Sequence, residues 1–284
     1  MVFTKIFDAH CDTLSTGRLL WRNEGHFDVE RALRRGGGVQ MMAAFGEGQE
    51  EQLQRLNRER GQMERELGAD LTLMAALEGA DTVRSVEDAR RFLDLGVRCF
   101  GLTWNFNNAL GGGCAGACQG LTELGRKVIA LCEEQGVTLD LAHASRETFW
   151  SVLECSHHPM VVTHACMDAL RPHERNLDDA QLRALGQRGG VVGVTFYRPF
   201  LSGDSEARSG RDCTLERVVE HICHAVEVAG EDAVGIGSDF DGCDALPLGL
   251  EDTLCLPALI ESLPFPDRIR EKVAYCNFAR VLLY

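Results

Sequence analysis

Short runs of apolar residues recur along the chain, and stretches with the spacing of amphipathic helices separate them. A continuous run of about five to eight residues, rich in Val, Ile, Leu and Phe, is typical of a buried strand. Eight such runs are found, at residues 2–10, 37–45, 71–79, 97–105, 137–145, 159–166, 189–197 and 233–242. Helix-like stretches lie between them, at residues 49–68, 85–96, 121–136, 145–156, 177–189 and 214–230. Several of these begin at Ser, Thr or Asp and end at Gly, as helices often do.

The alternation of buried strands and helices predicts an α/β fold. Strands that are apolar on both faces form parallel sheets covered by helices. Eight strand and helix units fit a closed (β/α)8 barrel of the TIM type, and a doubly wound open sheet is the alternative. The open sheet is less favoured, because no GxGxxG turn follows the first strand and GIGSDFDG at residues 235–242 has a different spacing. With 284 residues and no linker-like segment, we predict one barrel domain over residues 1–284.

Charge and hydropathy narrow the range of partners. The formal net charge is -14 and there is no basic stripe, which argues against nucleic acid and anionic membrane surfaces. The N-terminus lacks a basic segment followed by a long apolar run, and no stretch reaches the roughly 20 apolar residues of a membrane-spanning helix. We therefore expect a soluble, cytoplasmic protein.

The cysteines are numerous, and without an export signal we expect reduced thiols rather than disulfides among the twelve of them. Cys114 and Cys118, in GGGCAGACQG, are close enough in sequence to bind zinc. No second pair of Cys or His follows at a suitable spacing. A mobile glycine-rich loop is the interpretation that we favour for this segment.

Polar residues gather where the apolar runs end, and in barrels of this kind chemistry collects at the carboxyl ends of the strands. The first run ends in FDAHCD, which places Asp8, His10 and Asp12 at alternate positions, and a strand would point all three to one side. Each polar residue alone has an ordinary explanation, such as a hydrogen-bonded core histidine or a loop carboxylate. Their shared position at one end of different strands favours a functional site. The polar residues at the ends of the later apolar runs are Glu78, His143, His164, Asp239 and Asp241.

Three imidazoles and two or three carboxylates, without paired cysteines, suit zinc or a similar divalent ion. Five ligands are too many for one tetrahedral catalytic ion. Two ions about 3.5–4 Å apart, bridged by a carboxylate, would use them all. Glu78 can offer one oxygen to each ion, so it is the natural bridge.

The chain also resembles the membrane (renal) dipeptidase family of zinc peptidases (peptidase family M19), nearly from end to end. The similar segments are FDAHCD, GGVQMMAAF, MAALEGAD, LDLAHAS, VVTHAC, GIGSDFDG and CNFARVL. The resemblance implies a (β/α)8 barrel of the metal-dependent hydrolase kind, with two zinc ions per chain. It implies hydrolysis of small dipeptides, including those with a C-terminal D-residue, by a soluble member of the microbial type.

The resemblance also implies a role for each residue. His10, Asp12 and Glu78 would hold one ion, and Glu78, His143 and His164 would hold the other. Asp239 would act as the acid and base, with Asp241 as the next candidate. Arg175, in HERNLDD, would bind the terminal carboxylate of the substrate, although an arginine at this place is also typical of a surface charge at a helix entry.

One segment departs from the family pattern. Members commonly carry a histidine in LTH after the fourth strand, whereas this chain reads LTWNFNN. Trp104 has a single N–H donor, so we expect it to form a wall of the pocket. The asparagines that follow, Asn105, Asn107 and Asn108, could supply amide donors to the substrate.

The departure keeps two other functions open. One is a di-metal amidohydrolase or lactonase that acts on another small amide or ester. The other is a non-catalytic barrel that binds metal, which an intact ligand set and Asp239 disfavour. The sequence also lacks the tail of membrane-anchored relatives, and it leaves a homodimer open.

Overall fold

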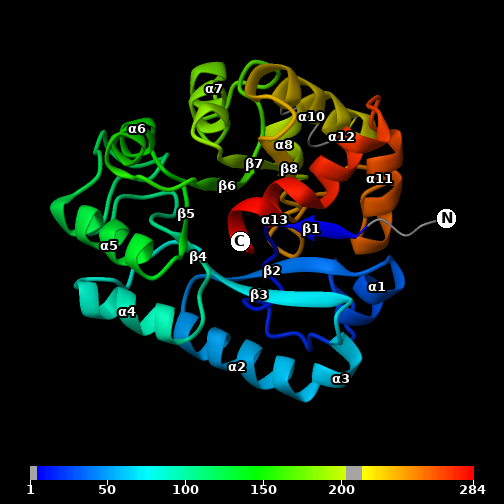
Figure 1. Ribbon diagram of the computed structural model, residues 1–284, viewed down its shortest axis with the longest axis horizontal. Helices are drawn as coiled ribbons and strands as arrows, with labels where there is room; N and C mark the ends of the chain where they lie inside the picture. The colour runs from blue at the N-terminus through cyan, green and yellow to red at the C-terminus, as the bar shows by residue number, and fades with distance from the viewer. Residues whose placement is uncertain (1–4, 203–212) are drawn as a thin grey trace.

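The fold is a closed barrel of eight parallel strands in chain order, and the computed structural model describes residues 5–202 and 213–284 (Figure 1). Each strand pairs with the next, and β8 pairs with β1. This confirms the (β/α)8 barrel and rules out the open sheet. The strands are β1 (Ile6–Asp8), β2 (Gly38–Ala44), β3 (Leu71–Leu77), β4 (Cys99–Gly101), β5 (Thr138–Asp140), β6 (Val161–Ala165), β7 (Val191–Val194) and β8 (Val234–Ile236). All eight strands fall within the predicted runs. Residues 2–4 of the first run lie outside the described residues.

Six helical stretches follow the predicted spacing, and the longest of them is split. The stretch over residues 49–68 forms α2 (Gln49–Gln62) and α3 (Glu64–Leu67), which are separated at Met63. Several helices begin where a Ser, Thr or Asp side chain accepts a backbone N–H of the first turn, as the caps predicted. The remaining five helices of this set are α4 (Val86–Asp94), α5 (Glu123–Glu134), α6 (Arg146–Cys155), α7 (Asp179–Gln187) and α10 (Leu215–Ala229).

The sequence pattern missed five short α-helices. They contain only four to seven residues, which is too short for a helical period to be recognised. These are α1 (Val29–Arg34), α8 (Arg198–Leu201), α11 (Leu256–Ser262), α12 (Asp267–Glu271) and α13 (Asn277–Leu282). A 3₁₀ turn, η1 (Thr253–Cys255), and a π-helical turn, η2 (Lys272–Cys276), complete the described elements.

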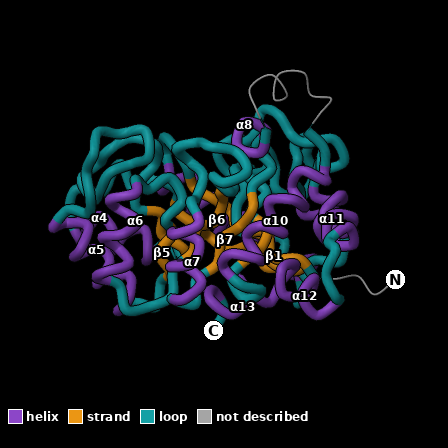
Figure 2. Tube along the Cα trace, turned by 90° about the horizontal axis from the view of Figure 1, so that it is seen from above, coloured by secondary structure: helices purple, strands orange, loops and turns teal. Residues whose placement is uncertain are grey.

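The barrel interior is apolar at the end opposite the site. Phe7, Val39, Met41 and Val191 form a buried cluster there. Phe278 of α13 joins the same cluster, and its ring lies 5.5 Å from that of Phe7. Figure 2 shows the strands surrounded by helices, with α13 on the side of the barrel away from α8. α13 thus packs into this end of the barrel, and the polar residues singled out by the sequence lie at the carboxyl ends of the strands.

No helix in the described residues is both long enough and apolar enough to cross a bilayer. All twelve cysteines are among the described residues, and no disulfide joins any two of them there.

Candidate active site

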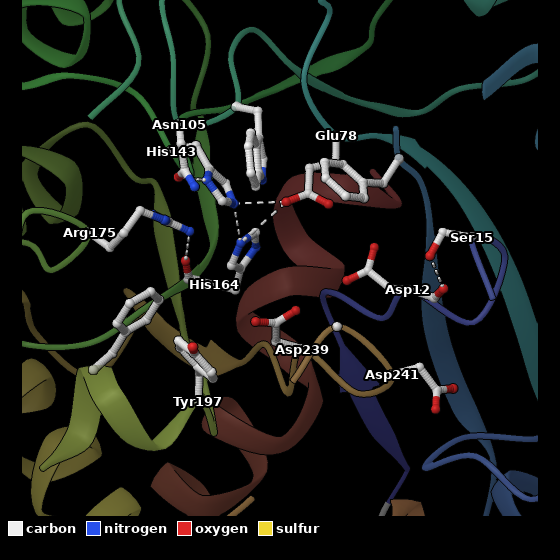
Figure 3. Close-up of a pocket in the computed structure, with 14 residues that line it drawn as sticks. Asp12, Ser15, Glu78, Asn105, His143, His164, Arg175, Tyr197, Asp239 and Asp241 are labelled. Carbon is white, nitrogen blue, oxygen red and sulfur yellow. Dashed lines mark hydrogen bonds and ion pairs between the residues drawn. The ribbon is translucent and has the colours of Figure 1, made fainter. Parts of the chain in front are cut away.

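A pocket of about 380 Å³ opens at the carboxyl ends of the strands (Figure 3). It is lined by polar residues that follow different strands, and by four aromatic side chains. The polar residues that the sequence singled out and that line this pocket are Asp12, Glu78, Trp104, Asn105, His143, His164, Arg175, Asp239 and Asp241. His10 lies beneath them and is 2% exposed.

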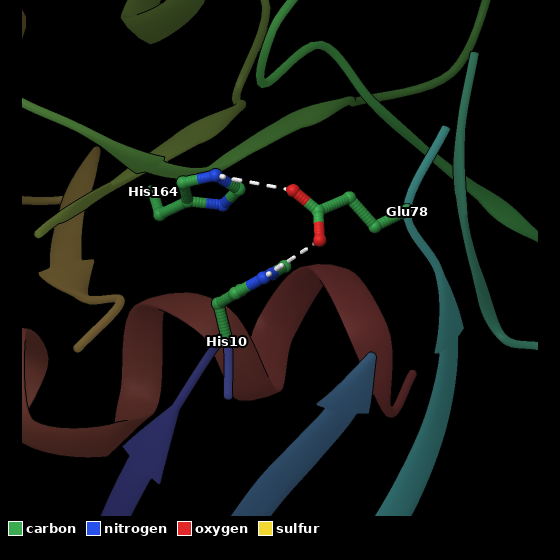
Figure 4. Close-up of side chains that lie close together, drawn as sticks. All are labelled: His10, Glu78 and His164. Atoms are coloured by element: carbon green, nitrogen blue, oxygen red, sulfur yellow. Dashed lines mark ion pairs between the residues drawn. The ribbon is translucent and has the colours of Figure 1, made fainter. Parts of the chain in front are cut away.

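Glu78 lies between two groups of side chains and presents one oxygen to each (Figure 4). Its Oε2 is 3.4 Å from Nε2 of His10. Its Oε1 is 2.8 Å from Nε2 of His143 and 3.7 Å from Nε2 of His164. The two oxygens of one carboxylate therefore face opposite sides of the site, as a bridging ligand requires.

The His10 side of the site contains two further carboxylates. Nε2 of His10 is 3.4 Å from Oδ2 of Asp12 and 4.0 Å from Oδ1 of Asp239. Each of these three residues offers a ligand atom within 4.8 Å of the other two, and so do His10, Glu78 and His164. The structure thus brings together all the side chains for which sequence reasoning proposed metal binding. It also places Asp239, expected only as an acid and base, among the potential ligands.

The charges on this side of the site are strongly coupled. Burial alone would lower the pKa of His10, but the carboxylates of Glu78 and Asp12 raise it well above the usual value. Burial would raise the pKa of Glu78, yet the neighbouring imidazoles hold it well below its usual range. Burial, followed by the charge of Asp12, raises the pKa of Asp239 well above the usual value. A concentration of buried carboxylates around one imidazole is an environment that favours added positive charge.

On the other side of Glu78, the surroundings of both imidazoles disfavour the protonated form. Burial and the charge of Arg175 lower the pKa of His143 to about 4. Burial, followed by the charge of His10, lowers the pKa of His164 well below the usual value. Neutral imidazole is the form that ligates metal ions.

The backbone is strained at this end of the barrel. In the described parts of the chain, only three residues other than glycine have a positive φ, namely His143 at 65°, Asp239 at 62° and Asp241 at 65°. Such conformations cost of the order of 1–3 kcal/mol each, and they cluster at functional sites. All three follow the strands β5 and β8, which carry predicted site residues.

On the His10 side of the site, two buried polar atoms have no hydrogen-bond partner in the described part of the chain: Nε2 of His10 and Oδ1 of Asp12. Leaving a buried polar atom unsatisfied costs about 1–3 kcal/mol. A cation bound by these atoms would remove that penalty, and imidazole and carboxylate ligands suit zinc or a similar ion. The residues present therefore fit the divalent metal that the family resemblance implies.

Arg175 is a buried guanidinium without an acidic partner. Its side chain is 7% exposed, and within the described residues no carboxylate lies at ion-pair distance from it. Its Nη2 donates to the backbone oxygen of His164 at 3.5 Å, its Nε has no partner, and its guanidinium lies 5.5 Å from the ring centre of Phe200. Burial lowers the pKa of Arg175. An unpaired buried cation that faces a pocket is well suited to bind an anionic group of a ligand.

Aromatic side chains form walls of the pocket. The ring of Trp104 lies 5.4 Å from that of Phe45 and 6.0 Å from that of His143. Tyr197 and Phe200 line the pocket near Arg175. Sequence reasoning expected the wall at Trp104 but missed Phe45 and Tyr197. Their position at the last residue of an apolar run was the signal available, because the carboxyl ends of the strands lie at the mouth of a barrel.

The three asparagines after Trp104 differ from one another in their contacts. Oδ1 of Asn105 is 2.7 Å from Nδ1 of His143, so this amide oxygen faces an imidazole. The Nδ2 of Asn107 donates to the backbone oxygen of Ala117. The Nδ2 of Asn108 donates to Asp81 and to the backbone oxygen of Leu102. Asn107 and Asn108 therefore stabilise the loop, and neither is among the described residues that line the pocket. That they donate to a substrate stays a prediction.

Asp241 and Asp8 have structural partners away from the metal ligands. Oδ2 of Asp241 accepts from Oγ1 of Thr13 at 2.6 Å, and its Oδ1 accepts from the backbone N–H of His26 at 2.8 Å. Asp241 thus ties the loop after β1 to β8, and its oxygens are occupied. Asp8 is buried and accepts from Ser238 and Gln40, so it does not share a site with His10 as the alternating pattern predicted.

The first part of the glycine-rich loop is packed against its neighbours. Gly111, Gly112 and Gly113 are buried, and the backbone N–H of Cys114 donates to the backbone oxygen of His143 at 2.8 Å. A Cβ on Gly113 would lie 2.2 Å from the backbone oxygen of Trp104. Glycine is required here because two stretches of the loop after β4 lie directly against each other.

Comparison with known proteins identifies the family. Residues 54–283 match the model of the membrane dipeptidase family (peptidase family M19). A protein of Klebsiella pneumoniae from the pqqA 5' region is 36% identical over 223 residues, which are 75% of this chain and 81% of that protein. An uncharacterised dipeptidase of Schizosaccharomyces pombe is 33% identical over 196 residues, which are 67% of this chain and 46% of that protein. The chain thus spans just under half the length of the yeast relative.

The fold and the family agree with solved structures. A metallopeptidase of Rhodobacter sphaeroides, solved with a phosphinate mimic of the dipeptide L-Ala-D-Ala, has a TM-score of 0.84 and 25% identity over 99% of both chains. A structure described as dipeptidase AC has a TM-score of 0.84 and 26% identity over 99% of this chain and 98% of that chain. The barrel, the family model and these relatives support one conclusion: the chain belongs to the membrane dipeptidase family, whose members are hydrolases of peptide bonds.

Proposed function

We propose that this protein is a dipeptidase that uses two divalent ions, zinc or a similar metal, to hydrolyse small dipeptides. The observation that carries the proposal is the position of Glu78. Its two oxygens face separate groups of potential ligands, His10 with Asp12 on one side and His143 with His164 on the other. Glu78 would bridge the two ions.

When bound, such ions polarise a carbonyl oxygen and lower the pKa of water, so that hydroxide is available near neutral pH. The protein supplies the remaining steps. Asp239 lies beside this group, with its Oδ1 4.0 Å from Nε2 of His10. It would accept the proton of the attacking water and pass it to the nitrogen that leaves. The C–N bond breaks as the new C–O bond forms, and the products are two amino acids.

Arg175 would bind the free carboxylate of the substrate. Burial without a carboxylate partner supports this role, since a substrate carboxylate would give the guanidinium the charge-assisted hydrogen bonds that it lacks. The site would thereby favour dipeptides with a free C-terminal carboxylate over peptides in which that carboxylate is blocked. The similar metallopeptidase of Rhodobacter sphaeroides was solved with a mimic of a dipeptide that ends in D-Ala. Dipeptides with a C-terminal D-residue are accordingly among the substrates that we propose.

Trp104 favours a narrow range of substrates. It occupies the place of the family histidine and packs against Phe45 at the wall of the pocket. We propose that this wall restricts the substrate to small side chains. The same substitution favours a second candidate function, hydrolysis of another small amide or ester by the same two ions.

A panel of substrates with defined metal content tests the proposal. The protein is stripped with a chelator, reloaded with zinc and analysed for metal content, and we expect about two equivalents per chain. The panel contains L,L- and L,D-dipeptides, N-acyl amino acids and lactones. Turnover of dipeptides that is lost with chelator and restored by zinc supports the proposal. Turnover of only the other amides or lactones would replace it with the second candidate, and a loaded protein that holds one ion would refute the bridge.

A further inference from the structure

The His143 and His164 rings each have a hydrogen-bonded partner at Nδ1, the nitrogen that faces away from Glu78. For His143 the partner is Oδ1 of Asn105, at 2.7 Å. An amide oxygen can only accept a hydrogen bond, so Nδ1 of His143 must carry the hydrogen. In a neutral ring, Nε2 is then left with a bare lone pair.

The partner of His164 is the hydroxyl of Thr163, at 3.0 Å from Nδ1. A hydroxyl could either donate to this nitrogen or accept from it. Here the choice is made by Asp140, whose Oδ2 lies 2.6 Å from the same hydroxyl oxygen. An ionised carboxylate only accepts, so the hydroxyl hydrogen points to Asp140 and the oxygen must accept from Nδ1–H of His164.

Asp140 is itself held in place. It is buried, and its Oδ1 accepts the backbone N–H groups of Ala142 and Thr163 at 2.9 Å each. With both oxygens occupied by donors, the carboxylate cannot rotate away from the hydroxyl without losing hydrogen bonds in a buried setting. The direction of the hydrogen bonds from Asp140 to His164 is therefore fixed by the fold.

We infer that these two hydrogen-bonded chains, Asn105 for His143 and Asp140 with Thr163 for His164, are positioning devices that select the Nδ1–H form of both rings. The consequence lies at the other nitrogens. Nε2 of His143 is 2.9 Å from Nε2 of His164 and 2.8 Å from Oε1 of Glu78. The lone pairs of these two nitrogens and of Oε1 of Glu78 then face one another, and no hydrogen lies between the three atoms. That arrangement is repulsive unless a cation is present, so the chains prepare this half of the site for a metal ion.

The inference gives Asn105 a role that the sequence did not predict, because its oxygen accepts a hydrogen bond from an imidazole. The expectation that its amide N–H groups face the substrate is a separate one and stays a prediction. The neighbouring contacts support the role of the oxygen, because Cys114 holds the backbone oxygen of His143 at 2.8 Å and its Sγ also donates to Oδ1 of Asn105 at 3.4 Å. The loop after β4 therefore orients His143 through both its backbone and its ring.

The inference rests on the proposed metal site but not on the identity of the substrate. Partners of this kind fix the orientation of a ligating imidazole, and their loss typically lowers metal affinity about 10- to 100-fold. The test uses Thr163→Val, which removes the hydroxyl and keeps the shape. Thr163→Ser restores the hydroxyl. Thr103→Val is the matched control, because Thr103 is also buried and its hydroxyl has no hydrogen-bond partner among the residues that the structure describes.

The first readout is the tautomer in the metal-free protein, from the ¹⁵N shifts of the imidazole nitrogens at about pH 8, where the reference pKa of histidine leaves the rings neutral. We expect hydrogen on Nδ1 of both His143 and His164 in the wild-type protein. Thr163→Val should shift His164 toward the Nε2–H form and leave His143 unchanged. Asn105→Leu should shift His143 toward the Nε2–H form and leave His164 unchanged. Hydrogen on Nε2 of either ring in the wild-type protein would overturn the inference for that ring.

The second readout is zinc affinity, measured by competition with a chromogenic chelator. Thr163→Val should weaken the binding of one of the two ions about 10- to 100-fold, with recovery in Thr163→Ser and no change in Thr103→Val. Wild-type affinity in Thr163→Val would refute the positioning role. If the wild-type protein has these tautomers and binds zinc but cleaves no dipeptide, the proposed substrate is wrong and the inference stands.

Discussion

Arg175 offers the sharpest test of how this site selects its substrate. Its guanidinium is buried, lacks a carboxylate partner within the described residues and lies at the edge of the pocket. If it binds the substrate carboxylate, the pair is formed in a place from which water is largely excluded. Removing one partner of such a pair typically costs about 2–5 kcal/mol. For Arg175→Gln we therefore expect kcat/KM for a free dipeptide to fall about 30- to 5,000-fold.

The assay is a cycle of two enzymes and two substrates. Wild-type protein and Arg175→Gln are each compared on a dipeptide and on the same dipeptide with a C-terminal amide. The wild-type enzyme should lose a similar factor on the amide, because the guanidinium then lacks its partner. The variant should treat both substrates nearly alike, since neither can form the pair. Arg175→Lys should lose less activity than Arg175→Gln but should remain below the wild-type enzyme, because an ammonium cannot reproduce the planar, bidentate contact.

Two controls separate recognition from folding. The free energy of unfolding, measured with urea, should not decrease in Arg175→Gln, because a buried cation without a partner does not stabilise the free protein. Arg183→Gln, at an arginine that is 57% exposed on α7, should leave kcat/KM unchanged. Equal cleavage of free and amidated dipeptides by the wild-type enzyme would refute the role of Arg175.

Four further outcomes are expected. Glu78→Gln should weaken the binding of both ions, measured by elemental analysis after dialysis, because its two oxygens face both groups of ligands; loss of one ion alone would contradict the bridge. Asp239→Asn should lower kcat about 10²- to 10⁴-fold with metal content retained, since a general acid and base is lost, whereas loss of an ion would assign Asp239 to ligation. Trp104→Ala should broaden the accepted side chains with both ions still bound, and an unchanged specificity profile would show that this wall does not contact the substrate. His221 is buried, accepts the backbone N–H of Met167, and has a pKa lowered by burial to about 4. The unfolded chain therefore binds the extra proton as the pH falls from about 6.5 to 4, and stability should drop by about 3 kcal/mol over that window; urea unfolding of His221→Gln should lack this part of the pH dependence, and an equal dependence in both proteins would contradict it.

The order of strands and helices could be predicted from the local spacing of apolar and polar residues. A buried parallel strand needs apolar residues on both faces, and a covering helix needs a stripe at helical spacing, so each element can be recognised without its neighbours. Short helices such as α8 and α13 escaped because four to six residues contain too little of a period. The positions of His10, Glu78 and His143 at the ends of apolar runs also placed them at one end of a barrel before any coordinates were considered.

Side-chain partners depended on the tertiary structure. The pattern around the first strand grouped Asp8 with His10 and Asp12, but Asp8 is held by Gln40 and Ser238 from the neighbouring strands. No local signal could reveal those contacts, because they join residues far apart in the chain. The same limit applies to the glycines before Cys114. Their sequence suggests a mobile loop, but it does not reveal the contact that they make between two loops.

The local pattern was enough to predict the barrel, and the motifs at the strand ends were enough to suggest the family and the side chains at the open end. What each of those side chains faces depends on the folded chain. It assigned Asp241 to the loop after β1, brought Asp239 beside His10, and turned the oxygen of Asn105 toward His143 rather than into the pocket. The physical reason is that backbone elements follow from the periodicity of neighbouring residues. The direction of a hydrogen bond or the neutral form of an imidazole is set by groups that the folded chain brings together from different strands.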